Sequence, residues 1–91
     1  MNEPAAQPDV LMYTQALCGY CAAARELLNN KGISYTEIDV MVNPSKKAEM
    51  MQRANGGRTV PQIFIGGDHV GGCDDLYDLE RAGHLDGMLA A

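Results

Sequence analysis

Two cysteines separated by two residues, Cys18 and Cys21, constrain the fold more than any other feature of this chain. They lie between a short apolar segment, residues 10–13, and a run of strong helix formers, residues 22–28. The first segment predicts a β-strand and the second a helix, so the cysteines mark the junction of a strand and a helix. A C-x-x-C pair has two plausible chemistries, a redox dithiol or half of a tetrahedral zinc site.

The position at the start of a helix favours the redox dithiol. Unpaired backbone N–H groups and the partial positive charge of a helix N-terminus stabilise a thiolate over a thiol. Cys18 lies at the mouth of the predicted helix, so we expect it to be the exposed nucleophile. Cys21 lies one turn further in, on a face that begins to bury, and within disulfide reach of Cys18. Two unrelated structural cysteines are the alternative interpretation.

The composition and the net charge indicate a small globular protein and argue against two classes of partner. The 91 residues are 46% apolar and 21% charged, which is ordinary for one small globular domain. The formal net charge of −5 argues against binding to nucleic acid or to an anionic membrane, and no apolar run is long enough to cross a bilayer.

The termini and the cysteine count predict the domain boundary and the compartment. Residues 1–8 lack a signal-peptide pattern, and we expect them to form a disordered tail in front of a domain at residues 9–91. Three cysteines, an odd number, favour a reducing, cytoplasmic location over a disulfide framework.

The hydrophobic pattern predicts an α/β fold in the order β-α-β-α-β-β-α, with a four-stranded mixed sheet flanked by helices. Strands are expected at residues 9–14, 33–40, 60–65 and 69–71, and helices at residues 18–31, 44–54 and 73–83, with a short closing helix near residues 85–89. The first strand is apolar on both faces, which is typical of a central strand, and its connection through a helix predicts a parallel partner.

Particular residues define the helices in this prediction. The first helix should bury Cys21, Ala24, Leu27 and Leu28 and expose Arg25. The second should begin at Pro44, with Asn43 as its N-cap, and should bury Ala48 and Met51.

Three stretches together resemble the glutaredoxins, in particular the small bacterial dithiol type. They are residues 18–21 (CGYC), 59–65 (TVPQIFI) and 71–76 (GGCDDL), and the resemblance covers residues 10–89. It implies a thioredoxin-like fold and a glutathione-dependent thiol–disulfide oxidoreductase, a monomer that reduces disulfide-containing and glutathionylated proteins. Thioredoxin itself fits poorly, because the chain has no tryptophan and lacks that protein's WCGPC motif.

The resemblance implies a glutathione site built from these stretches. Thr59, Val60 and Pro61 match the family's segment with a cis proline, in which the backbone of Val60 pairs with the cysteinyl part of glutathione. Tyr20 would shield one flank of the tripeptide, and Arg58 is a candidate for binding its glycyl carboxylate. An edge-strand proline and a solvated loop arginine are the structural alternatives.

Gly72, Cys73 and Asp74 match the segment that binds the γ-glutamyl end of glutathione. Backbone N–H groups at a helix start would take its carboxylate, and the Asp74 side chain would take its ammonium group. Helix capping by Asp74 and Asp75 is compatible with this role. For Cys73 we expect packing at the helix start, with a regulatory thiol as the alternative.

Two residues depart from the family pattern. Gly19 stands where the commonest active site has proline. Some glutaredoxins without that proline hold a [2Fe–2S] cluster between two monomers, with glutathione as co-ligand, so a dimer using Cys18 from each chain is the alternative function. Gln15 stands where many relatives carry lysine; an amide can hydrogen-bond the glycyl carboxylate but supplies no charge. A zinc quartet of Cys18, Cys21, His69 and Cys73 is not expected, because a long folded segment separates the two pairs.

Overall fold

The first strand of the chain lies in the interior of the sheet. The computed structural model describes residues 7–90, which form a four-stranded sheet in the order β2-β1-β3-β4. Its elements are β1 (Val10–Thr14), α1 (Gly19–Asn30), β2 (Thr36–Asp39), α2 (Pro44–Arg53), β3 (Gln62–Ile65), β4 (Asp68–Gly71), α3 (Cys73–Arg81) and α4 (Leu85–Leu89). The pair β1/β2 is parallel and the pairs β1/β3 and β3/β4 are antiparallel, which confirms the predicted mixed sheet.

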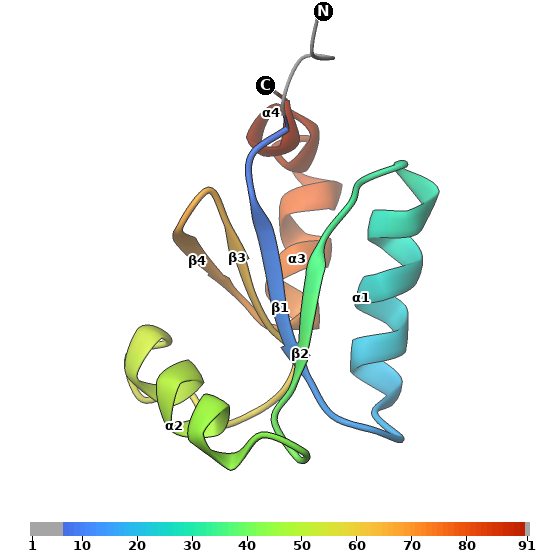
Figure 1. The fold of residues 1–91 in the computed structure, drawn as a ribbon. Helices are drawn as coiled ribbons and strands as arrows, with labels where there is room; N and C mark the ends of the chain where they lie inside the picture. The colour runs from blue at the N-terminus through green and yellow to red at the C-terminus, as the bar shows by residue number, and fades with distance from the viewer. Residues whose placement is uncertain (1–6, 91) are drawn as a thin grey trace, which may run out of the picture.

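Helices cover both faces of this sheet (Figure 1). On one face, Met12 of β1 belongs to a core cluster with residues of α1 and α3, such as Leu28 and Leu76. On the other face, Tyr13 packs in a second cluster with Met50 of α2. Successive side chains of β1 therefore enter opposite cores, which is why this strand is apolar without alternation.

Helix α1 buries the stripe that its sequence predicts. Cys21, Ala24, Leu27 and Leu28 are its buried residues, at a spacing that puts them on one face of the helix. Packing of this stripe against the sheet fixes the direction of α1. Its N-terminal end, with both thiols, stands at the edge where β1 ends.

Two strands begin later than predicted. β2 starts at Thr36 instead of residue 33, because its pairing runs only from Leu11 with Thr36 to Thr14 with Asp39 along the five residues of β1. β3 starts at Gln62 instead of residue 60. The segment that contains Val60 and Pro61 is therefore a loop that enters the sheet.

Helix α2 buries a different face from the predicted one. Met50 and Ala54 are buried, whereas Ala48 is exposed and Met51 is only partly buried. The prediction was wrong because two adjacent methionines in a polar helix fit either face. Met50 belongs to the buried cluster with Tyr13 and Phe64, and Met51 packs against the edge of that cluster.

The loop between β2 and α2 is organised by Asp39. Its Oδ1 accepts the backbone N–H of Met41 over 2.8 Å, and its carbonyl oxygen accepts from Nδ2 of Asn43 over 3.1 Å. Asn43 precedes the helix at Pro44 as predicted, but its side chain does not cap the helix because it bonds back to Asp39.

Gln7 is attached to the segment before β2. Its Nε2 donates to the carbonyl oxygen of Ser34 over 2.6 Å, and its Oε1 accepts from the Ser34 N–H over 3.1 Å. Of the predicted disordered tail, residues 1–8, the structure describes Gln7 and Pro8, and residues 1–6 lie outside the described part of the chain, so the tail stays a prediction. Within the described residues, no helix has the length and apolar character to cross a membrane.

Candidate active site

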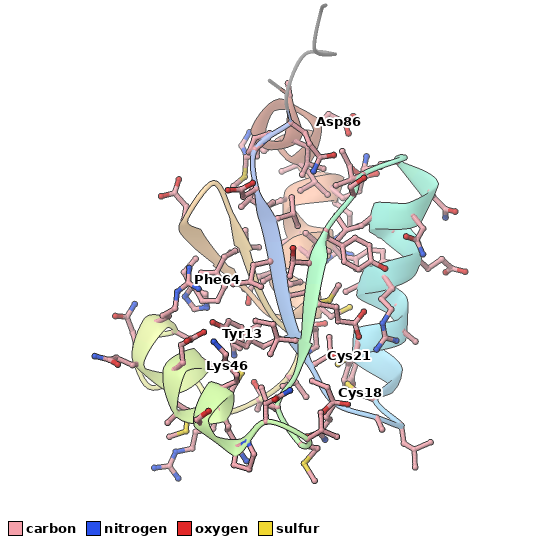
Figure 2. All side chains as sticks on the ribbon, viewed as in Figure 1. Tyr13, Cys18, Cys21, Lys46, Phe64 and Asp86 are labelled. Atoms are coloured by element: carbon pink, nitrogen blue, oxygen red, sulfur yellow. The ribbon has the colours of Figure 1, made fainter. Side chains whose placement is uncertain are left out.

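Cys18 caps the N-terminus of α1 with its own sulfur. Its backbone is extended (φ −108°, ψ 110°), and its Sγ accepts a hydrogen bond from the backbone N–H of Cys21 over 3.1 Å. Figure 2 shows both cysteines at this end of α1. The sulfur thus lies at the end of the helix where backbone N–H groups have no partner within the helix. The sequence prediction placed Cys18 at this position.

Cys21 differs from Cys18 in its surroundings. It is fully buried, whereas Cys18 is partly exposed. Burial, and after it the hydrogen bond with Cys18, raises the pKa of the Cys21 thiol far above its ordinary value. The pair therefore consists of one accessible sulfur and one sheltered thiol that stays protonated at neutral pH.

The peptide bond between Val60 and Pro61 is cis, as the resemblance implied. Pro61 is buried, and the carbonyl oxygen of Val60 lies 3.8 Å from the Sγ of Cys18. The loop before β3 thus brings backbone polar groups next to the sulfur of Cys18, although more than 40 residues of chain separate them.

A groove of about 450 Å³ runs from this loop to the start of α3. Seven of the predicted site residues line it: Tyr20, Thr59, Val60, Pro61, Gly72, Cys73 and Asp74. We call it the cis-proline groove. Arg58 is exposed and is not part of its lining, so the structure does not bring this predicted residue into the groove.

The start of α3 is shaped by Gly71 and Asp75. The Asp75 Oδ2 accepts the backbone N–H of Gly72 over 2.9 Å. Gly71 has φ +116°, and a Cβ there would meet the Asp75 Oδ2 at 2.3 Å, so only glycine fits. Because the Asp75 side chain already occupies the Gly72 N–H, the first-turn N–H groups left for an anion are those of Cys73, Asp74 and Asp75.

Gln62 and His69 also line the groove, and sequence reasoning assigned neither a role there. Gln62 donates from Nε2 to the carbonyl oxygen of Thr59 over 3.0 Å, so its Oε1 faces the Nε2 of His69 at 2.7 Å as an acceptor. This pair supports the loop of Thr59 from the β3–β4 hairpin. The contact depends on the strand register, which the sequence pattern does not specify.

Cys73 and Gly19 have simple environments. Cys73 is 7% exposed, and burial is the main cause that raises its pKa. A Cβ added at Gly19 would meet nothing within 4 Å. Across residues 7–90, no three metal-ligating side chains come together, so the zinc quartet with His69 does not form there.

Arg25, predicted to face water, is half-buried in an ion pair with Glu37 of β2. The Nε and Nη2 of Arg25 donate to Oε1 and Oε2 of Glu37 over 2.9 and 2.8 Å, and the Thr14 hydroxyl also donates to Oε2 over 2.7 Å. The hydrogen bond from Arg25 is the main cause that lowers the pKa of Glu37. This cluster ties α1 to both parallel strands directly beside Cys21.

Comparison with known proteins shows the family of the chain. The glutaredoxin family model matches residues 10–70. The glutaredoxin of Pseudomonas aeruginosa is 52% identical over 84 residues, which is 92% of this chain and 99% of the relative.

Two solved structures superpose on the fold. The solution structure of a Brucella melitensis glutaredoxin has a TM-score of 0.82 at 51% identity, covering 97% of this chain and 95% of the other. A buckwheat glutaredoxin–glutathione complex has a TM-score of 0.82 at 35% identity, and the match covers 91% of this chain and 76% of the buckwheat chain. These matches confirm the thioredoxin-like fold. The chain belongs to the glutaredoxin family of thiol–disulfide oxidoreductases.

Proposed function

We propose that Cys18 is the nucleophile, that Cys21 is the resolving thiol, and that glutathione binds in the cis-proline groove. One observation carries the proposal. The Cys18 Sγ accepts the Cys21 N–H over 3.1 Å and lies 3.8 Å from the carbonyl oxygen of Val60. The activated sulfur is thus adjacent to the backbone that would hold the cysteinyl part of glutathione.

The groove offers each part of glutathione a suitable partner. The backbone of Val60 would pair with the cysteinyl residue. The N–H groups of Cys73 and Asp74 would bind the γ-glutamyl carboxylate, as a helix N-terminus does for any anion. The exposed Asp74 carboxylate would pair with the γ-glutamyl ammonium group. The glutathione complex of the buckwheat relative supports this assignment.

The glycyl carboxylate of glutathione has two candidate partners in this site. Arg58 and the half-buried Gln15 are its candidate partners, and Arg58 would have to reach it from outside the groove lining. Only Arg58 brings a charge, and an exposed ion pair contributes about 0.2–1 kcal/mol.

For a glutathionylated protein, the Cys18 thiolate attacks the glutathione sulfur of the mixed disulfide. The bond between the protein and glutathione sulfurs breaks, a new bond joins Cys18 to glutathione, and the protein sulfur leaves as a thiolate. A second glutathione thiolate then attacks the sulfur of the bound glutathione. It restores the Cys18 thiolate and releases oxidised glutathione, so one reduced glutathione is consumed and the disulfide bond passes from the protein to glutathione.

For a protein disulfide, Cys18 attacks one of the two sulfurs and the other leaves as a thiolate. The enzyme is then covalently joined to its substrate. Cys21 loses its proton to the departing sulfur and attacks Cys18, which frees the reduced protein and leaves a Cys18–Cys21 disulfide. Two glutathione molecules reduce that disulfide and become oxidised glutathione. The high pKa of Cys21 suits this order, because Cys21 reacts only after Cys18 has been used.

A cytoplasmic location suits this reaction. It consumes reduced glutathione, which a reducing compartment supplies, and both thiols must start in the reduced state. The monomer is sufficient for this chemistry, because one chain contributes the two thiols and the groove.

The lesser candidate function is a [2Fe–2S] cluster held by two monomers and glutathione. It is favoured only by the open space at Gly19, which leaves the turn before Tyr20 free to adapt. A cluster takes four ligands, and one chain offers a single accessible thiol, Cys18, since Cys21 and Cys73 are buried. Visible absorption after anaerobic purification, lost in Cys18→Ser, would identify this form.

The experiment that tests the proposed function is turnover of a small glutathione mixed disulfide by glutathione, coupled to glutathione reductase. We expect turnover that saturates with glutathione. A protein that gives no rate above the uncatalysed exchange does not have this function.

A further inference from the structure

Four large apolar side chains project into solvent in the described part of the chain. They are Leu17, Tyr20, Met41 and Val42, with exposed fractions of 106%, 68%, 63% and 72%. Single exposed apolar residues are common and need no explanation. These four, however, come from only two short segments of the chain. We call them the apolar rim.

Both segments leave the same edge of the sheet. β1 and β2 are parallel, Thr14 pairs with Asp39, and the Val40 N–H donates to the Thr14 carbonyl oxygen over 2.9 Å. The loop that carries Leu17 and the loop that carries Met41 therefore start side by side, at the lower edge in Figure 1. Cys18 stands at the end of the first of these loops. The apolar rim thus flanks the reactive sulfur.

The backbone presents these side chains in fixed positions. Leu17 has φ +57°, a left-handed conformation that leucine rarely adopts, although its side chain gains no contact from it. Met41 and Val42 are held by Asp39, whose Oδ1 accepts both of their N–H groups, over 2.8 and 3.4 Å. A strained, fully exposed leucine directly before the nucleophile is typical of a site that has a function beyond stability.

Glutathione does not explain the apolar rim. Of its four residues only Tyr20 lines the cis-proline groove. Leu17, Met41 and Val42 lie outside the groove lining, so a ligand confined to the groove leaves them in water. A polypeptide with a disulfide must bring its sulfur to Cys18 as well, and it is larger than the groove. Its residues next to the target cysteine are therefore the natural occupant of the surface on this side.

We propose that the apolar rim docks protein-disulfide substrates and selects those with apolar residues beside the target cysteine. Tyr20 joins the rim to the groove, so the occupied surface is continuous with the glutathione site. The proposal rests on the proposed function, because it assumes that Cys18 attacks protein disulfides. It adds the chemical class of the preferred substrate. Apolar contact also suits an acidic protein, whose net charge of −5 offers little general attraction to acidic partners.

The test compares two disulfide-bonded peptides of equal length that differ only beside the half-cystines, leucine and valine in one and serine in the other. We expect kcat/KM for the apolar peptide to be about tenfold higher, a difference of about 1.4 kcal/mol. Two variants remove apolar side chains from the rim. Leu17→Asn introduces a polar residue that adopts the left-handed backbone readily, and the second is the double variant Met41→Ser/Val42→Ser. Each should reduce the preference severalfold. Lys47→Ser, at an exposed residue of α2, is the matched control and should retain the full preference.

Turnover of the small glutathione mixed disulfide separates the failure of this proposal from the failure of the proposed function. Both rim variants should keep that rate. Equal rates for the two peptides in the unaltered protein, with normal turnover of the small substrate, would overturn the docking surface alone. The docking surface would also be overturned if both variants kept the full preference for the apolar peptide. An equal fall in kcat/KM for the two peptides and the small substrate would overturn it too. If the rim variants instead convert a dimer to a monomer in sedimentation, the rim is a contact between two copies and the proposal is wrong.

Discussion

The backbone N–H of Cys21 donates to the Sγ of Cys18 over 3.1 Å, so the two thiols stand together at the start of α1. Their environments differ, because Cys18 is partly exposed and Cys21 is fully buried. Burial is the main cause that raises the pKa of the Cys21 thiol, and a hydrogen bond with the Cys18 side chain adds to it. The pH behaviour expected of Cys21 follows from this burial.

The first prediction concerns the titration of Cys21. Burial, the larger cause of its raised pKa, remains when Cys18 is replaced. In a Cys18→Ser/Cys73→Ser protein, the rate of alkylation at Cys21 should therefore rise with pH through a mid-point above the ordinary thiol value of about 8.5. Rate against pH, followed by mass spectrometry, measures it. A mid-point at or below 8.5 would show that burial does not control this thiol.

A proline at position 19 should stabilise the fold. Gly19 is the first residue of α1, where proline is favoured, Cys18 is already extended as a residue before proline must be, and a Cβ at position 19 meets no atom within 4 Å. Gly19→Pro should raise the free energy of unfolding by about 0.4–1 kcal/mol, measured by urea denaturation. Gly71→Ala is the opposite control and should lower it, because its Cβ would clash with Asp75. A destabilised Gly19→Pro protein would mean that the turn needs glycine.

Asp74 should contribute to binding of the γ-glutamyl end. Its exposed carboxylate lines the groove, so Asp74→Ala removes one exposed ion pair, worth about 0.2–1 kcal/mol. The apparent KM for glutathione should rise by up to about fivefold, less at high salt. Asp78→Ala, an exposed acid of the same helix that pairs with Arg81 outside the groove, should leave KM unchanged. Equal effects of the two variants would indicate general electrostatics instead of a specific contact.

Gln15 gives a gain-of-function prediction. If it lies beside the glycyl carboxylate, Gln15→Lys adds a charge at that end of the tripeptide. Glutathione use should improve by about 0.2–1 kcal/mol, and the gain should shrink as salt screens the pair. An apparent KM for glutathione that does not change at low salt would show that residue 15 points elsewhere.

Local patterns predicted the parts of the molecule that depend on a single helix or strand. The four buried residues of α1 and the central place of β1 follow from spacing and from the lack of alternation, and both are confirmed. The face of α2 could not be predicted, because the sequence does not distinguish Met50 from Met51, and only packing against the sheet buries Met50 fully and Met51 partly.

The cis-proline groove could also be predicted only in part from the sequence. Seven residues that the three family motifs singled out line it, while the Gln62–His69 contact needs the register of β3 with β4. The pair Arg25–Glu37 likewise depends on how α1 crosses β2, which no local pattern contains.

The roles of the two thiols separate by substrate. Removing glutathione from a mixed disulfide requires one nucleophile, because free glutathione can attack the intermediate on Cys18. Reduction of a protein disulfide leaves the enzyme tied to its substrate. In the proposed mechanism Cys21 would act there within the same molecule, at an effective concentration that dilute glutathione does not match.

The rate of deglutathionylation in single-cysteine variants tests the central claim most directly. With a small glutathione mixed disulfide as substrate, Cys18→Ser should have no activity. Cys21→Ser should retain the rate, or exceed it because the internal disulfide no longer forms, while it loses most protein-disulfide reduction. Cys73→Ser is the control and should keep both activities. If Cys21→Ser abolishes deglutathionylation and Cys18→Ser preserves it, Cys21 is the nucleophile and the mechanism is the reverse of the one derived from the structure.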